Sequence, residues 1–206
     1  MEIELKFLVE DELVKDRILN DGHLLSMAES DTPEVIPMRA IYLDTEEYSM
    51  LKKTMAFRVR YEGERPVATL KWGGKSENGL HERGELNVSV DEEYVKEPHM
   101  GIFKGSEIYE EIAETVGDKP LIPVMEMEFI RKEVHVDTGK SISVVSYDEG
   151  EIRTSNGTER ISELEVELYS GSQEDMIALG RELATKYNLK AGEKSKFKRG
   201  IELLGI

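Results

Sequence analysis

One face of the first strand of this chain is charged along its whole length. Residues 1–6 read Met-Glu-Ile-Glu-Leu-Lys, and side chains alternate between the faces of a strand, so Glu2, Glu4 and Lys6 share one face. Residues 163–168, Glu-Leu-Glu-Val-Glu-Leu, repeat the acidic pattern near the other end of the chain. Because like charges are costly to bury without a partner or a ligand, these strands require a fold that compensates them.

The cations of the chain also fall on strand-like segments. In residues 55–62, Arg58 and Arg60 alternate with apolar residues. Other strand-like or terminal segments carry Lys71, Arg83, Arg131 and Lys196. An open sheet with a solvated face would accept one such strand, whereas a closed barrel that these faces line accounts for the whole set. The barrel interior would then be a polar channel rather than a packed core.

Such an interior suits a small anion that is bound together with a metal ion. Carboxylates hold Mg²⁺ or Mn²⁺ through their oxygens, and the ion can bridge phosphate oxygens. Arginine forks and lysine point charges bind the remaining phosphate oxygens. The residues therefore predict a metal-bridged polyphosphate site.

Hydrophobic periodicity and turn residues predict a single α+β domain over residues 1–206. Strands are expected at 1–9, 36–44, 55–62, 67–72, 80–90, 121–137, 142–149, 151–155 and 159–168. Helices are expected at 12–21, 46–52, 173–187 and 194–204, with an interrupted acidic helical stretch over 91–119. Residues 26–35 predict a loop, Gly22 the end of the first helix, and Gly73-Gly74 the close of a hairpin.

Composition excludes several classes of protein. The chain has no cysteine, which excludes disulfides and thiolate metal sites and favours a cytoplasmic location. No apolar run reaches about 18 residues and the start lacks a signal-peptide pattern, so no membrane association is expected. The net charge of −16 argues against general nucleic-acid binding, which depends on neutralising phosphates.

The ordered motifs of the chain resemble the CYTH domain of the triphosphate tunnel metalloenzymes. This family includes class IV adenylyl cyclases, thiamine triphosphatases and inorganic triphosphatases. The likeness begins with Glu2-x-Glu4-x-Lys6 and continues through Tyr42-Leu43-Asp44-Thr45, Phe57-Arg58-Val59-Arg60, Thr69-Leu70-Lys71, Glu82-Arg83-Gly84-Glu85, Arg131, Asp148-Glu149-Gly150, Glu163-Leu164-Glu165-Val166-Glu167 and Ser195-Lys196. Their order and spacing are kept over nearly the whole length.

The resemblance implies a closed eight-stranded antiparallel barrel with peripheral helices, whose tunnel binds a triphosphate with Mg²⁺ or Mn²⁺. The metal ligands it implies are Glu2, Glu4, Glu163, Glu165 and Glu167. The phosphate-binding residues it implies are Lys6, Arg58, Arg60, Lys71, Arg83, Arg131 and Lys196. Catalytic roles would fall to Lys6, which orients the nucleophile, to Asp148 near the metals, and to Glu85, which orients Arg83 or a metal-bound water.

The leading functional hypothesis is a divalent-metal-dependent triphosphatase acting on inorganic triphosphate or a related organic triphosphate. A class IV adenylyl cyclase, converting ATP to cyclic AMP and pyrophosphate, is the alternative, because the same tunnel can host both reactions. A non-catalytic nucleotide- or polyphosphate-binding module is a third. The sequence leaves open whether the protein is a monomer or a homodimer. It assigns Lys194, Lys198 and Arg199 to capping of the last helix, and a slip of one residue would exchange Arg131 with Lys132.

Overall fold

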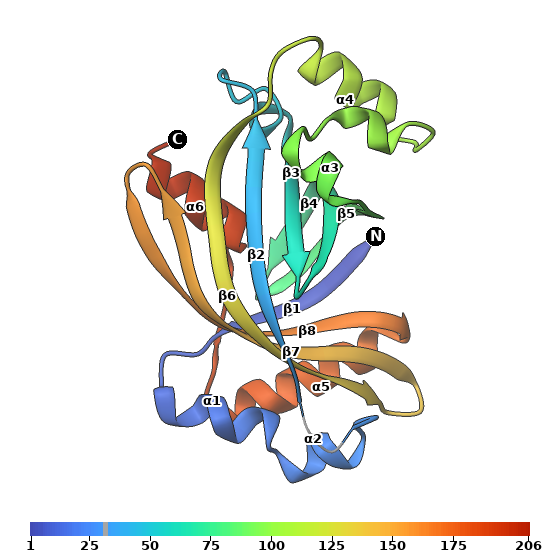
Figure 1. Cartoon of the computed structure of the whole chain (residues 1–206). Coiled ribbons are helices and arrows are strands. Elements are labelled where there is room, and N and C mark those ends of the chain that lie inside the picture. Colours follow the sequence, from blue (N-terminus) through green and yellow to red (C-terminus); the bar gives the residue numbers. More distant parts are fainter. Residues whose placement is uncertain (31–32) are drawn as a thin grey trace.

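The computed structural model describes residues 1–30 and 33–206 of the chain. Within these residues the strands form one antiparallel sheet, which closes into an eight-stranded barrel in the order β5-β4-β3-β2-β6-β7-β8-β1, with β1 paired to β5 (Figure 1). The strands are β1 (Glu2–Leu8), β2 (Glu34–Asp44), β3 (Met55–Glu62), β4 (Arg65–Glu77), β5 (Leu80–Ser89), β6 (Ile122–Asp137), β7 (Ser141–Thr154), β8 (Gly157–Gly171) and β9 (Lys190–Ala191). The short β9 extends one edge of β1 beyond β5. The expected closed eight-stranded barrel is confirmed.

Helices cover the barrel at both ends. They are α1 (Glu12–Leu19), α2 (Gly22–Ser26), α3 (Glu92–Lys96), α4 (Tyr109–Val116), α5 (Gln173–Tyr187) and α6 (Lys196–Leu204), with 3₁₀ helices η1 (Leu51–Lys53) and η2 (Met100–Phe103). Helices α1, α2 and α5 gather at one end of the barrel and α3 and α4 at the other (Figure 1). Helix α6 lies beside the hairpin of β7 and β8.

The largest apolar core lies outside the barrel wall. Leu5 and Phe7 of β1 pack in one cluster with Met176 and Leu179 of α5. At Gly180 of α5 a Cβ atom would lie 2.6 Å from Leu5 Cδ1, so glycine permits the close approach of helix and strand. Fully burying one such Leu or Phe side chain contributes about 1.5–3 kcal/mol. Packing of the apolar face against α5 turns the charged face of β1 into the barrel.

A second outer core covers β3 and β4. Phe57 and Leu70 pack with Phe103 of η2 and Ile112 of α4, and the rings of Phe57 and Phe103 meet edge to face at 5.9 Å. This core holds the segment between β5 and β6 against the wall. Arg58 and Arg60, which alternate with the residues of this core along β3, are consequently directed inward.

The barrel interior is charged on only one side, so the expectation of a wholly polar channel is wrong. Met38 and Ala40 of β2 and Met127 of β6 form a third apolar cluster, to which Ile201 of α6 belongs. The charges that alternate with these residues, such as Arg39 and Glu128, lie on the outer face. The inward apolar residues pack α6 against this side and leave the charged side as a cavity.

Two glycines that predicted turns lie inside strands instead. Gly150 does not separate two strands, because β7 is continuous from Ser141 to Thr154. A Cβ atom at Gly150 would lie 2.1 Å from the carbonyl oxygen of Glu128, so the glycine permits close contact with β6. Gly73 likewise does not end the hairpin: β4 continues to Glu77 with a shift of register between Trp72 and Lys75. The turn comes at Asn78-Gly79, where both φ angles are positive.

The helix predictions were also wrong in places. Residues 46–52 form turns followed by η1, because the Asp44 carboxylate accepts hydrogen bonds from the backbone nitrogens of Met50 (3.0 Å) and Leu51 (2.9 Å). The stretch 91–119 divides into α3, η2 and α4. Gly22 begins α2 rather than ending α1, which stops at Leu19. The predicted loop 26–35 includes residues 31–32, which lie outside the described residues, and β2 begins already at its end. Helix α5 is confirmed at 173–187.

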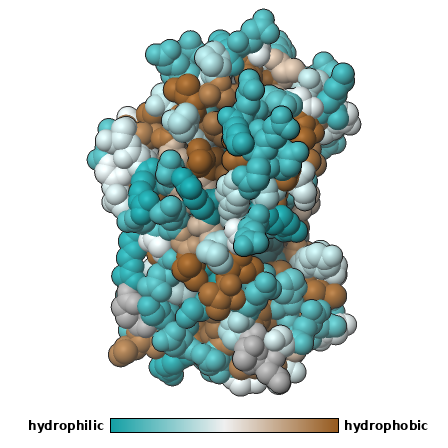
Figure 2. Space-filling view, viewed as in Figure 1, coloured by the Kyte–Doolittle hydropathy of each residue, from teal (hydrophilic) through white to brown (hydrophobic). Residues whose placement is uncertain are grey.

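Hydrophilic residues cover most of the face shown in Figure 2, and hydrophobic residues form separate groups on it. This surface accords with the net charge of −16, which favours solubility. None of the helices in the described part of the chain combines the length and the apolarity that crossing a bilayer requires.

Asp21 joins α2 to the end of α5. Its buried carboxylate accepts hydrogen bonds from the backbone nitrogens of His23 (2.9 Å) and Leu24 (3.2 Å), and it contacts Lys186 and the hydroxyl of Tyr187. Burial alone would raise the pKa of Asp21, but Lys186, Tyr187 and the backbone donors more than offset burial and lower the pKa. The ionised form is therefore the stabilising one.

We expect D21A to lower the free energy of unfolding by about 2 kcal/mol and D21N, which keeps a capping oxygen, by about 1 kcal/mol. Because the folded pKa is lowered, the contribution of the charge is full above the unfolded pKa of about 3.9 and is lost as the pH falls toward the folded pKa. Urea unfolding of wild type and D21N should therefore differ less at a pH of about 2.5 than at pH 7. An equal difference at both values would contradict the ionic contribution.

Candidate active site

Strand β1 lies where the barrel closes, and both of its edges are paired. On one edge Glu4 lies opposite Glu167 of β8, and Lys6 lies opposite Glu165. On the other edge residues 2–5 pair with β5. The two ends of the chain therefore bring their acidic side chains to neighbouring positions on the inner wall, as the sequence predicted.

These inner faces line a cavity of about 140 Å³. Among the described residues its cationic side chains are Lys6, Arg58, Arg60, Lys71, Arg83, Arg131 and Lys196. Its carboxylates are Glu2, Glu4, Glu85, Glu165 and Glu167. The remaining lining residues are Tyr42, Asn87, Phe129, Ser195 and Phe197. Seven cations and five carboxylates line the cavity, so an anion bound there would have cationic partners on several strands.

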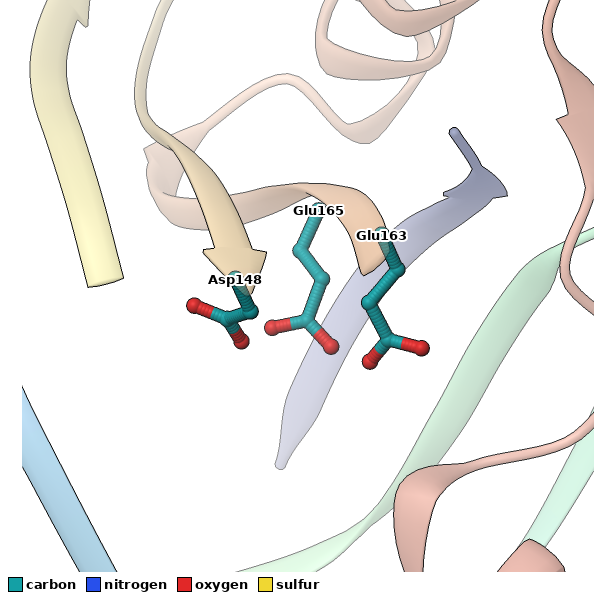
Figure 3. Close-up of side chains that lie close together, drawn as sticks. All are labelled: Asp148, Glu163 and Glu165. Atoms are coloured by element: carbon teal, nitrogen blue, oxygen red, sulfur yellow. The ribbon is translucent and has the colours of Figure 1, made fainter. Parts of the chain in front are cut away.

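At one side of the cavity, Asp148 of β7 and Glu163 and Glu165 of β8 lie side by side (Figure 3), and one oxygen of each lies within 4.8 Å of the others. Two ammonium groups share these carboxylates. Lys6 Nζ lies 3.2 Å from Glu163 Oε1 and also contacts Glu165. Lys196 Nζ lies 2.7 Å from Asp148 Oδ2 and 2.9 Å from Glu165 Oε1. We call these three carboxylates and two lysines the lysine cluster; its charges largely neutralise one another.

Arg131 joins the lysine cluster from β6. Its Nε and Nη2 atoms lie 2.8 and 2.7 Å from the two oxygens of Asp148, and Nη2 lies 2.8 Å from Glu165 Oε2. Burial alone would raise the pKa of Asp148, but Arg131 and Lys196 outweigh burial and lower it, so Asp148 is ionised. Lys132 faces outward toward Asp16, which confirms the expected register at Arg131.

A second ionic group surrounds the start of β1. Glu2 Oε1 lies 2.8 Å from Lys71 Nζ, and Glu2 Oε2 lies 2.5 Å from Arg83 Nε. Arg83 also reaches Glu4 at 3.5 Å. Glu85 contacts Lys71 and not Arg83, so it does not orient Arg83, and the alternative, that it orients a metal-bound water, stays a prediction. Arg83 turns instead toward the two carboxylates of β1.

Glu167 completes an acidic group with Glu2 and Glu4. Burial, and then the charges of Glu2 and Glu4, raise the pKa of Glu167 to about 7. A crowded set of carboxylates is the oxygen donor set that Mg²⁺ or Mn²⁺ prefers. The carboxylates of the lysine cluster lie close together, and their oxygens contact ammonium groups. Glu2 and Glu4 also contact cations, but Glu167 is crowded by these two carboxylates, and a bound divalent cation would relieve that crowding. The acidic group of Glu2, Glu4 and Glu167 therefore fits a divalent cation better.

Arg58 and Arg60 of β3 line the same cavity as this acidic group. Their Nε atoms are buried and have no hydrogen-bond partner within the described residues. Arg58 Nη1 donates to the Tyr42 hydroxyl at 3.2 Å, and Arg60 pairs with Glu62. Burial, and then the charge of Arg58, lower the pKa of Arg60 to about 10. Two guanidinium groups at one wall, each with an unpaired donor, are suited to hold an anion.

The structure thus places twelve of the fourteen sequence-predicted residues on the cavity and two, Asp148 and Glu163, behind its wall. Sequence reasoning missed Tyr42, Asn87, Phe129, Ser195 and Phe197, which line the cavity. It also assigned Arg199 to helix capping, whereas Arg199 Nη1 lies 3.0 Å from Glu163 Oε2. The signals for two of them were present: Asn87 shares its strand face with Arg83 and Glu85, and Arg199 follows Lys196 at helical spacing.

We expect D148N to lower the free energy of unfolding by about 3 kcal/mol, because it leaves Arg131 and Lys196 buried with less compensation. The matched control is E151Q on the same strand, whose carboxylate is partly exposed and pairs with Arg153. It should change the free energy of unfolding by less than about 0.5 kcal/mol. Urea unfolding measures both, and a D148N protein as stable as E151Q would contradict this reading of the lysine cluster.

The CYTH domain family model matches residues 1–201 of this chain. The inorganic triphosphatase of Haemophilus influenzae is 30% identical over 164 residues, which are 80% of this chain and 45% of that relative. The chain thus spans less than half the length of this curated relative.

Solved structures share the fold. A putative adenylyl cyclase from Hippeastrum, which has a dominant triphosphatase activity, superposes with a TM-score of 0.73 at 17% identity and covers 98% of this chain and 96% of its own. A putative adenylate cyclase from Bacillus halodurans gives a TM-score of 0.63 at 20% identity, with 97% and 96% covered. Since the family model extends from β1 into α6, this chain belongs to the CYTH domain family.

Proposed function

We propose that this protein is a divalent-metal-dependent triphosphatase that hydrolyses inorganic triphosphate or a related organic triphosphate. The observation that carries the proposal is the pair of buried, unpaired Nε donors of Arg58 and Arg60 in a cavity that seven cationic side chains line. Phosphate oxygens are the acceptors that such guanidinium groups bind best. The identity of 30% to a relative that is an inorganic triphosphatase supports the same reaction.

The size of the cavity favours a phosphate chain over a nucleotide. Its volume of about 140 Å³ is well below the roughly 300–1,000 Å³ of pockets that hold drug-sized molecules. A base and a sugar would have to lie outside it. The alternative of a class IV adenylyl cyclase, in which a ribose hydroxyl attacks the α-phosphorus, therefore receives less support from the cavity.

In this proposal the cations of the cavity hold the phosphate oxygens, and Glu2, Glu4 and Glu167 hold Mg²⁺ or Mn²⁺. When bound, the metal ion neutralises phosphate charge and polarises the bond to the terminal phosphorus. Glu165 belongs to the lysine cluster and also lines the cavity, as Glu167 does, so it would contribute either to the metal ion or to the position of Lys6.

Lys6 would orient the attacking water or the terminal phosphoryl group by donating hydrogen bonds. Burial alone would lower its pKa, but Glu163, Glu165 and Glu4 outweigh burial and raise the pKa. Lys6 is therefore a permanent cation near neutral pH and not a proton acceptor. Asp148, which is ionised behind the cavity, would act by holding Arg131 and Lys196 at the phosphate rather than by contacting the substrate.

Incubation of the purified protein with Mg²⁺ or Mn²⁺ and inorganic triphosphate, ATP or thiamine triphosphate tests the proposal. We expect orthophosphate to be released from a triphosphate, with turnover lost when the metal is chelated by EDTA. Product analysis by ion chromatography distinguishes the alternatives. Cyclic AMP with pyrophosphate would identify a cyclase instead, and tight binding without any product would identify a binding module.

We expect E4Q to reduce kcat at least about 100-fold, because it removes one charged ligand from the metal site while keeping the shape of the side chain. The matched control is E128Q on the outer face of β6, where the carboxylate is exposed and pairs with Arg153. It should retain wild-type turnover. Circular dichroism checks that both variants are folded. Wild-type rates in a folded E4Q protein would remove Glu4 from the metal site.

A further inference from the structure

Glu163 differs from the other acidic residues on its face of β8. Glu165 and Glu167, two and four residues further along the same face, line the cavity. Glu163 is fully buried behind the wall. Figure 3 shows its carboxylate beside that of Glu165. Glu163 therefore shares a strand face with two candidate metal ligands, but, unlike them, it does not line the cavity.

Both oxygens of Glu163 already contact cations. Oε1 lies 3.2 Å from Lys6 Nζ and also contacts Lys196 Nζ. Oε2 lies 3.0 Å from Nη1 of Arg199. A divalent cation bound to this carboxylate would face three positive charges at contact distance. Glu163 is thus saturated by the protein itself.

Two of these cations come from α6. Lys196 and Arg199 are three residues apart, so they project from one face of the helix. Arg199 also reaches β8 twice more, through Glu159 at 2.6 Å and through the carbonyl oxygen of Arg160. Arg199 therefore fastens the first turns of α6 to the start of β8, with Glu163 at the centre of the contact.

The same turn of α6 reaches the cavity. Ser195, Lys196 and Phe197 line it, and the ring of Phe197 stacks on Tyr42 at 5.1 Å. One turn further along the helix a Cβ atom at Gly200 would lie 2.5 Å from Met125 Sδ, so the helix sits close against β6. The position of α6 therefore decides where the ammonium group of Lys196 lies in the cavity.

We propose that Glu163 is a positioning residue and not a metal ligand. With Arg199 it fixes α6 on β8, and it thereby holds the ammonium groups of Lys6 and Lys196 at the cavity. The effect on triphosphate binding rests on the proposed function, whereas the attachment of α6 does not. Arg199 contacts neither the cavity nor the acidic group of Glu2, Glu4 and Glu167. Replacing Arg199 therefore tests the positioning role of Glu163 without removing a candidate metal ligand.

The test compares E163Q, R199M, the double variant, the conservative R199K, and K198A as a control on the exposed face of α6. E4Q serves as the reference for a lost metal ligand. Affinity for Mn²⁺ alone is measured by electron paramagnetic resonance of the free ion. KM and kcat for inorganic triphosphate are measured separately, and thermal unfolding reports the attachment of α6.

We expect E163Q and R199M to keep the dissociation constant for Mn²⁺ within about threefold of wild type, whereas E4Q raises it at least about tenfold. Both variants should raise KM about tenfold with kcat nearly unchanged, because Lys196 is displaced from the bound phosphate. The double variant should be little worse than either single one, since both changes break the same contact. R199K, which keeps the cation, should recover part of the loss, and K198A should match wild type.

The proposal is overturned if E163Q weakens Mn²⁺ binding as much as E4Q does while R199M binds Mn²⁺ like wild type. It is also overturned if the losses in E163Q and R199M add fully in the double variant. If the wild-type protein proves to have no triphosphatase activity, the proposed function fails, and the dissociation constant for triphosphate from calorimetry replaces KM with the same tenfold criterion. The Mn²⁺ affinities, and whether the changes in unfolding temperature of E163Q and R199M add in the double variant, then decide the role of Glu163 without turnover.

Discussion

Lys6 and Lys196 share the carboxylates of Glu163 and Glu165, and the arrangement of the barrel interior depends on this contact. Each of these groups is buried, and none would be stable there alone. Removing one partner from a buried ionic group typically costs about 3–5 kcal/mol, because the other charge is left uncompensated. The contact joins β1, β8 and α6, so elements from both ends of the chain are held together by charge inside the barrel.

This interior is possible because the apolar cores lie elsewhere. Leu5 of β1 packs outward against α5, and Phe57 of β3 packs outward against η2 and α4. In many small barrels side chains fill the interior, but here helices cover the outer wall and supply the main burial of apolar surface. On the charged side of the barrel, the inward side chains therefore do not have to form an apolar core. On the other side the residues packed with Ile201 hold α6 in place.

The charges of the cavity are compensated in two different ways. In the lysine cluster the protein neutralises its own carboxylates, and burial is offset by ion pairs and hydrogen bonds. Around Glu167 and Arg60 the compensation is incomplete: the pKa of Glu167 rises to about 7 and that of Arg60 falls to about 10. Like charges crowd on each side of this region, which is the condition that a bound cation and a bound anion would relieve together.

The sequence by itself determined the barrel and most of the inner charges, because strict alternation assigns each residue of a strand to a face. Glu2, Glu4 and Lys6, and Arg58 with Arg60, lie inward as their strands predicted. Tertiary structure decided how the charges pair, because contacts between strands depend on register and on side-chain reach, which alternation does not encode. Hence Glu163 lies among three cations while Glu167, on the same face, lies beside two carboxylates. The continuity of β7 at Gly150 and the contact of Arg199 with Glu163 likewise exist only once neighbouring elements have packed together.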